Sequence, residues 1–258
     1  MRHAALLGPA GMLACIATAA ACSHPSIDEI DEVFHRGPRR VLCAAGLDDS
    51  AGNDLDSVLS GLERAAERNE IVSLYAHRPG GTVPVETIRK VVEEAVRYDL
   101  ATVSYAQLAV GLPTGTRGGV SLSFDDAHVD EWFDMREMLA YYGANVTFFV
   151  SRFDRLSDEQ RDKLHQLADD GHSIEAHGLR HQNAPEYVEE HGLDAYMEEE
   201  ALPSIQLLRD DGFDPVAFAY PFGSRTDELD DALLEHVLLL RSVSFSIESP
   251  VVTDPCPE

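Results

Sequence analysis

Short apolar runs alternate with helically periodic segments over most of this chain. The runs predict strands at 40–45, 71–76, 120–124, 145–150, 173–176, 216–220 and 242–247, and a short strand or a strand with a turn at 102–108. The periodic segments predict helices at 55–68, 85–98, 131–142, 158–169, 193–210 and 228–240. Such alternation is typical of an α/β fold with a parallel sheet. So many strands in one domain favour a barrel over an open sheet.

The charge balance limits the partners that the protein can bind. The chain has 46 acidic and 20 basic residues, so its formal net charge is -26 over 258 residues. A surface of this kind repels nucleic acid and anionic lipid headgroups. We therefore expect no nucleic-acid partner, and interpret the acidity as a solvated surface.

The first 21 residues have the layout of a secretory signal peptide. A basic start precedes a run from Ala4 to Ala21 that carries no charge, and Gly8 and Pro9 interrupt this run. It is too short and too broken for a comfortable membrane span. The segment 18–22 also resembles a lipoprotein cleavage site, which would make a lipidated Cys22 the only membrane attachment. The prediction is an exported protein, either a periplasmic or cell-surface lipoprotein or a secreted one.

The exported chain divides into a polar tether over 22–38 and a single domain over 39–258. Two cysteines, Cys43 and Cys256, stand near the two ends of that domain. In an oxidising compartment they could form one disulfide, and the alternative is two unpaired thiols. Their spacing does not resemble that of a CxxC metal site.

Chemically active side chains follow four of the predicted strands. Asp125 and Asp126 end one strand, His77 ends another, and His177 ends a third, while residues 221–223 (Pro-Phe-Gly) follow a fourth. Parallel α/β barrels place their active sites at the C-terminal ends of the strands. The sequence therefore predicts an active site at this pole of the barrel.

His177 and His181 have the spacing of two metal ligands. Residues four apart on one helical turn share a face, so both imidazoles could bind one ion. Such a pair alone is weak evidence for a metal site, but a carboxylate from another strand end strengthens the prediction. Two histidines and one carboxylate leave the open coordination position that catalytic zinc needs. In extended backbone Asp125 and Asp126 would point in opposite directions, so one could bind metal while the other acts as a base. The alternative is that they cap the following turn.

Four motifs over 118–225 resemble the polysaccharide deacetylase family, the NodB-homology domains of carbohydrate esterase family four. Residues 123–127 (SFDDA) resemble its TFDDG motif, and residues 145–150 (NVTFFV) its ATFFV strand. Residues 171–181 (GHSIEAHGLRH) resemble GHEIGNHTxxH, and residues 218–223 (FAYPFG) the FAYPYG form of the third motif. The resemblance implies a distorted (β/α)7-type barrel.

The same resemblance implies roles for individual residues. Asp125 would be the general base, and the backbone N–H of Phe222 would help to form the oxyanion hole. Asp126, His177 and His181 would bind one divalent metal ion, with zinc first and cobalt, nickel or iron as alternatives. The implied function is a metal-dependent hydrolase that removes acetyl groups from an N- or O-acetylated polysaccharide.

Two departures from the family pattern concern the acid and the arginine. The late L-x-H motif is missing, but residues 74–77 (LYAH) resemble the early strand of circularly permuted biofilm poly-N-acetylglucosamine deacetylases, which makes His77 the general acid. Its alternative is a turn histidine bound to backbone. Ala219 stands where the third motif has an arginine, and Arg180 or Arg225 could replace it. Trp132 is interpreted as helix packing.

These departures keep two other functions open. The first is an inactive carbohydrate-binding relative of the same fold, which the missing arginine and late motif suggest. The second is a metal-dependent amidase or esterase that acts on small molecules. A short closed pocket would favour the second, and a long open groove would favour a polymer.

Overall fold

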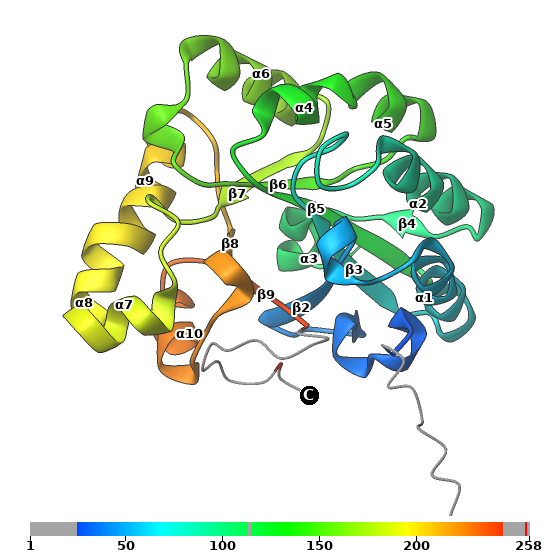
Figure 1. The fold of residues 1–258 in the computed structure, drawn as a ribbon, viewed down its shortest axis with the longest axis horizontal. Coiled ribbons are helices and arrows are strands. Elements are labelled where there is room, and N and C mark those ends of the chain that lie inside the picture. Colours follow the sequence, from blue (N-terminus) through cyan, green and yellow to red (C-terminus); the bar gives the residue numbers. More distant parts are fainter. Residues whose placement is uncertain (1–24, 113–114, 245–255, 257–258) are drawn as a thin grey trace, which may run out of the picture.

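The computed structural model describes residues 25–112, 115–244 and 256. Its core is a ring of short strands with helices around the outside (Figure 1). The strands are β1 (Phe34–His35), β2 (Val41–Gly46), β3 (Ile71–Ala76), β4 (Ala101–Thr102), β5 (Gly119–Asp126), β6 (Thr147–Val150), β7 (Ser173–Ala176), β8 (Ala217–Ala219) and β9 (Leu239–Val243). The helices are α1 (Leu55–Arg68), α2 (Val85–Arg97), α3 (Tyr105–Val110), α4 (Val129–Asp134), α5 (Arg136–Tyr142), α6 (Asp158–Asp169), α7 (Ala184–His191), α8 (Leu193–Tyr196), α9 (Leu202–Asp210) and α10 (Asp227–Leu233).

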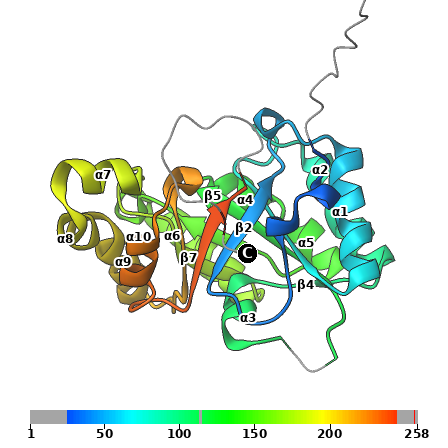
Figure 2. The same cartoon turned by 90° about the horizontal axis from the view of Figure 1, so that it is seen from below.

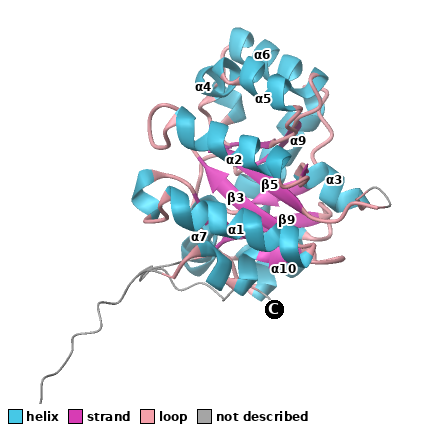
Figure 3. Ribbon diagram, turned by 90° about the vertical axis from the view of Figure 1, so that its right-hand side faces the viewer, coloured by secondary structure: helices cyan, strands magenta, loops and turns pink. Residues whose placement is uncertain are grey.

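Seven parallel strands close into a barrel. The ring runs β2, β3, β5, β6, β7, β8 and β9, and it closes because β9 also pairs with β2. The short strand β4 adds to β5, and β1 adds to β3 in the antiparallel sense. Figure 3 shows the strands at the centre with helices on their outer side. The predicted seven-stranded barrel in a single domain is confirmed.

The alternation of side chains along each strand separates two apolar clusters. The larger cluster joins the outer faces of the strands to the helices, with Leu74, Leu122, Phe148 and Trp132 among its buried members. A smaller inner cluster contains Leu42, Tyr105, Phe149, Ala217, Ala219 and Leu239. Figure 2 shows α3 below the strands, and Tyr105 of this helix donates its N–H to Thr147 Oγ1 of β6 over 2.9 Å. The first residue of α3 thus belongs to the barrel interior.

Two secondary-structure predictions need correction. The segment 102–108 is not a strand beyond Thr102, because Ser104 and Gln107 form a capping box that starts α3 at Tyr105. The helix predicted over 228–240 ends at Leu233, and the apolar run that follows contributes instead to β9. A short apolar run fits a buried strand as well as a helix, so periodicity alone does not separate them. This shift puts Arg241 inside a strand of the barrel.

The segment before β2 packs on the domain. Residues 27–35 lie within the predicted tether, yet Ile27 and Val33 are fully buried and Phe34 pairs with Val72 of β3. Ile27 also donates its N–H to Ser57 Oγ over 2.8 Å. Burial of these apolar side chains stabilises the segment against α1 and β3. The packed domain therefore begins before residue 39.

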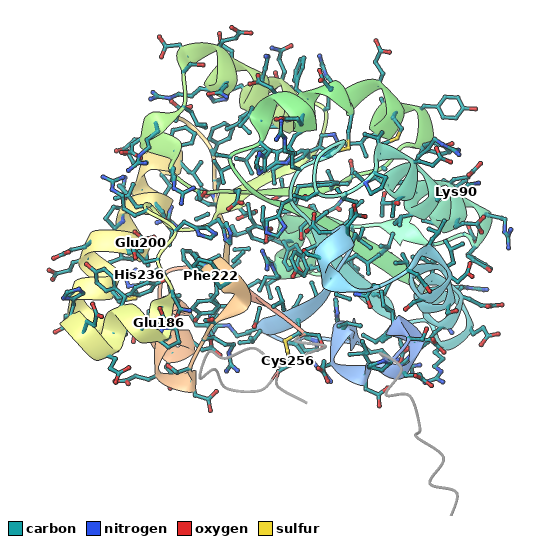
Figure 4. All side chains as sticks on the ribbon, viewed as in Figure 1. Lys90, Glu186, Glu200, Phe222, His236 and Cys256 are labelled. Carbon is teal, nitrogen blue, oxygen red and sulfur yellow. A yellow bond between two sulfur atoms is a disulfide. The ribbon has the colours of Figure 1, made fainter. Side chains whose placement is uncertain are left out.

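The C-terminal end is tied to the barrel by a disulfide. Cys43 of β2 and Cys256 are bonded, with their Cα atoms 6.1 Å apart and a sequence separation of 213 (Figure 4). Of the two alternatives that the sequence left open, the structure has the disulfide. The signal peptide, Cys22 and its lipidation lie outside the described residues. Within the described ranges, none of the helices combines the length and apolar character that a membrane span requires.

Candidate active site

All the predicted site residues lie at the C-terminal pole of the barrel. Asp125 and Asp126 end β5, His77 follows β3, His177 and His181 follow β7, and Phe222 follows β8. Backbone hydrogen bonds join neighbouring strand ends, since Ser151 donates to the Asp126 carbonyl over 2.8 Å and His177 to the Val150 carbonyl over 3.0 Å. Parallel strands of one barrel bring these distant sequence segments together.

Asp126, His177 and His181 offer three ligand atoms to one point. These atoms all lie within 4.8 Å of one another. The Asp126 Oδ1 atom is 3.1 Å from His181 Nε2 and 3.9 Å from His177 Nε2. Oδ1 is buried and has no hydrogen-bond partner among the described residues. A buried carboxylate oxygen between two imidazole nitrogens matches the ligand chemistry of a catalytic zinc site.

The electrostatics of the three residues suit metal binding. Burial lowers the pKa of His177 to about 4, so its imidazole is neutral at pH 7 and offers a lone pair. Its Nδ1 lies 2.9 Å from the Ala219 carbonyl, a hydrogen bond that leaves Nε2 to face Asp126. Burial opposes ionisation of Asp126, but the imidazoles of His181 and His177 outweigh it and hold the pKa of this carboxyl below its usual range.

The histidine pair is not on a helix, contrary to the prediction from its spacing. Residues 177–183 form an irregular loop between β7 and α7. The loop turns through two residues with positive φ, Gly178 at 79° and His181 at 63°. The ring centroids of His177 and His181 are still only 4.9 Å apart. The left-handed backbone of this loop therefore brings the two imidazoles together, which a helical turn was expected to do.

Strained backbone gathers at this pole. Among the described residues with positive φ that are not glycine, Asp126 (85°), His181 (63°) and Phe222 (60°) all belong to the site. Such conformations cost free energy for residues with a side chain and are often retained where function requires them. Helix α4 starts after His128 without a side-chain cap, so Asp125 and Asp126 do not cap it.

Asp125 is held by an arginine that sequence reasoning missed. Its Oδ2 accepts a hydrogen bond from Arg241 Nη2 of β9, and the two side chains are 2% and 1% exposed. The Arg241 guanidinium carbon lies 5.2 Å from the ring centroids of Tyr75 and Phe149, so it is enclosed by the barrel interior. Asp125 Oδ1 is buried and has no hydrogen-bond partner within the described ranges. One carboxylate oxygen is thus fixed while the other remains available.

The two arginines that the sequence suggested for this place serve other contacts. Arg180 pairs with Asp154 over 2.9 Å at the surface. Arg225 is buried and binds Asp230, which also accepts a hydrogen bond from the Tyr220 hydroxyl over 2.7 Å. That network supports the turn that carries Phe222. Arg241 went unrecognised because it fell between the helix predicted over 228–240 and the strand predicted over 242–247, whereas β9 covers Leu239–Val243.

His77 is paired with a second residue that the sequence did not single out, Asp48. The His77 Nδ1 and Asp48 Oδ2 atoms are 2.5 Å apart, and His77 also donates its backbone N–H to Asp48 Oδ1 over 3.2 Å. Burial disfavours the imidazolium, but Asp48 and the charges of Asp125 and Asp126 outweigh it and raise the pKa of His77 to about 9. Asp48 follows β2, the neighbour of β3, so its strand-end position was a usable signal.

Phe222, Trp132 and two further histidines are the remaining residues that the sequence singled out, and each has defined contacts. The Phe222 side chain is 56% exposed, and its ring centroid is 4.7 Å from that of His181. Trp132 is fully buried, stacks on Phe148 and donates its indole N–H to the His77 carbonyl over 3.0 Å. His128 Nε2 lies 3.9 Å from Asp126 Oδ2 and so borders the site. His172 accepts the Val146 N–H through Nδ1 over 3.2 Å, a structural role.

Comparison with known proteins agrees with this geometry. Residues 113–238 match the family model described as polysaccharide deacetylase. No curated protein matches the chain. The match covers the strands that carry Asp125, Asp126, His177, His181 and Phe222, and the barrel closes outside it through β2, β3 and β9.

Solved structures share the fold at low sequence identity. IcaB from Ammonifex degensii has a TM-score of 0.55 at 17% identity, over 68% of this chain and 85% of that one. The deacetylase PplD of Streptococcus pyogenes has a TM-score of 0.50 at 18% identity, over 70% and 93%. The BpsB deacetylase domain of Bordetella bronchiseptica has a TM-score of 0.50 at 14% identity, over 66% and 94%. At these identities the likeness establishes the fold.

Proposed function

We propose that this chain, whose residues 113–238 match the polysaccharide deacetylase family model, is a metal-dependent hydrolase that removes acetyl groups from an N- or O-acetylated polysaccharide. The observation that carries the proposal is the trio of Asp126, His177 and His181, whose ligand atoms lie within 4.8 Å of one another beside Asp125. Zinc suits this ligand set, and cobalt, nickel or iron are alternatives. A divalent ion held there supplies a Lewis acid for the acyl carbonyl and for water.

Each remaining residue then has a task that its position supports. Asp125 Oδ1 accepts a proton from the attacking water, while Arg241 holds the other oxygen. The backbone N–H of Phe222, in a turn closed by Gly223 N–H to the Tyr220 carbonyl over 2.9 Å, donates to the developing oxyanion. His77 donates a proton to the departing amine or alcohol.

The main reason to consider an inactive carbohydrate-binding relative no longer applies. That alternative rested on the missing third-motif arginine and late motif, and Arg241 supplies an arginine that binds Asp125. His77 with Asp48 likewise supplies an acid from the N-terminal side. Circular permutation relative to the family stays a prediction, and the origin of His77 before the matched region supports it.

Export is part of the proposal. The disulfide between Cys43 and Cys256 supports an oxidising compartment, as the signal-like residues 1–21 do. The protein would be either a lipoprotein attached through Cys22 or a secreted enzyme. Its net charge of -26 favours neutral or cationic polymers over anionic ones.

A panel of acetylated polymers tests the activity. Acetate release should be seen from at least one chitin-like, peptidoglycan, poly-N-acetylglucosamine or acetyl-xylan substrate. A chelator should abolish the release, and added zinc or cobalt should restore it, because the ligand set binds either ion. A metal-loaded protein that binds sugar and releases no acetate would instead be the inactive relative. Turnover of small acetyl esters or amides alone would identify the small-molecule hydrolase.

As the pH rises, the Asp48→Asn variant is expected to lose its activity at a lower pH than the parent does. His77 must be protonated to donate, and its raised pKa of about 9 keeps it so up to that pH. Without the Asp48 carboxylate the pKa of His77 falls, so the basic limb of the kcat/KM profile for acetate release moves to lower pH. Thr82→Val is the matched control, since it removes another hydrogen bond to Asp48 but keeps the carboxylate. An unmoved basic limb in Asp48→Asn would exclude His77 as the acid.

A further inference from the structure

Glu200 is a buried carboxylate that has no task in the proposed chemistry. Its side chain is 1% exposed, although it belongs to a helical segment rich in acidic residues. The neighbouring Glu198 and Glu199 are exposed. Figure 4 labels Glu200 on the segment before α9 and Phe222 on the turn after β8. A buried acid of this kind needs partners, because an unpaired charge in the interior is costly.

The partners of Glu200 are backbone N–H groups on both sides of His181. Oε1 accepts from the N–H of Arg180 over 2.9 Å and from that of Gln182 over 3.0 Å. Oε2 accepts from Arg180 over 2.8 Å, and the Glu200 carbonyl accepts from Leu179 over 3.2 Å. Hydrogen bonds to an ionised acceptor are stronger than neutral ones. Glu200 thus fixes the residues immediately before and after a metal-ligating histidine.

The helix that carries Glu200 is widened at this point. Residues Met197–Ala201 form a π-helical turn between α8 and α9. Such turns are rare and are often found at functional sites. The π-helical turn includes the exposed Glu198 and Glu199 and the buried Glu200. Of these three consecutive acids, the first two face solvent and the third faces the loop that carries His181.

The loop packs so closely against the Glu200 carboxylate that position 178 has no room for a side chain. A Cβ atom on Gly178 would lie 2.7 Å from Glu200 Oε1 and 3.3 Å from Pro221 Cγ. Gly178 also has a φ of 79°, which favours glycine. The same loop carries His181 at a φ of 63°, a conformation that persists only when its surroundings impose it.

We infer that Glu200 is a positioning residue for the metal ligand His181: its carboxylate anchors the 178–182 loop in the strained conformation that directs His181 Nε2 toward Asp126. The inference rests on the proposed metal site. It predicts that Glu200 controls metal affinity and ligand geometry, beyond any contribution to stability. Groups that orient metal ligands without binding the metal themselves typically alter the affinity for the metal by about 10–100-fold.

Metal titration of purified variants tests this role. The probes are Zn²⁺, measured by competition with a chromophoric chelator, and Co²⁺, measured by its visible absorption spectrum. Glu200→Ala should weaken the Zn²⁺ Kd by about 10–100-fold and alter the Co²⁺ spectrum. Glu200→Gln keeps one acceptor oxygen for Arg180 and Gln182, so it should retain most of the affinity. Glu198→Ala is the matched control from the same turn and should bind like the parent.

The outcomes separate this inference from the proposed function. A parent protein that binds neither ion contradicts the metal site itself. A parent that binds while Glu200→Ala binds equally well, with the same Co²⁺ spectrum, overturns the role of Glu200 even if the melting temperature falls. Where Glu200→Ala does not fold, Glu200→Asp decides. Its shorter side chain keeps the charge but cannot reach both N–H groups, so it should also weaken binding, and parental affinity and spectrum in it would overturn the inference.

Discussion

Replacing Asp125 with asparagine is expected to lower kcat for acetate release by a factor of about 10²–10⁴, the usual contribution of a general base. The amide has nearly the same shape but cannot take a proton from water at neutral pH. Asp125 is not among the three grouped metal-ligand candidates, so the variant should keep its metal. Initial rates of acetate release and the metal content of the same protein sample measure both effects.

Asp126→Asn provides the contrast for that experiment. It changes a carboxylate that lies 3.1 Å from His181 Nε2, so it should reduce metal affinity first and activity as a consequence. Excess metal should then recover part of the activity of Asp126→Asn and none of that of Asp125→Asn. Full activity in Asp125→Asn would exclude Asp125 as the base. Loss of metal from it would instead mean that the two aspartates share the ligand role.

The parts of the site that lie on strong local patterns could be predicted from the sequence. Asp125 and Asp126 end one predicted strand, and His177 follows another, so strand-end chemistry alone placed them at one pole. The closed barrel followed from the regular alternation of strands and helices. These features depend on residues close together in sequence, which is the range over which periodicity is informative.

The parts that were missed depend on contacts between distant segments. Arg241 meets Asp125 across 116 positions, and no local pattern marks an arginine inside a strand as the partner of a carboxylate. Asp48 meets His77 across 29 positions and stood among other loop carboxylates. The loop of His177 and His181 was expected to be helical because its spacing fits a turn. Its left-handed residues became visible only with the backbone.

Arg241→Met is expected to destabilise the fold by about 3–5 kcal/mol, the usual effect of removing one partner of a buried ion pair. The substitution keeps much of the side-chain volume but leaves the Asp125 carboxylate, 2% exposed, without its counter-charge. The free energy of unfolding, measured in urea at neutral pH, reports the loss. Activity should fall as well, because Arg241 no longer holds the carboxylate that takes a proton from water.

The double variant Asp125→Asn with Arg241→Met separates the pair from the packing around it. In the asparagine background position 125 carries no charge for Arg241 to neutralise, so the second substitution should cost much less than it does in the parent. Such non-additivity would mean that the pair contributes mainly by neutralising a charge which catalysis requires in a buried place. Equal losses in both backgrounds would mean that Arg241 stabilises the barrel through its contacts with Tyr75 and Phe149, and that the orientation of Asp125 has another source.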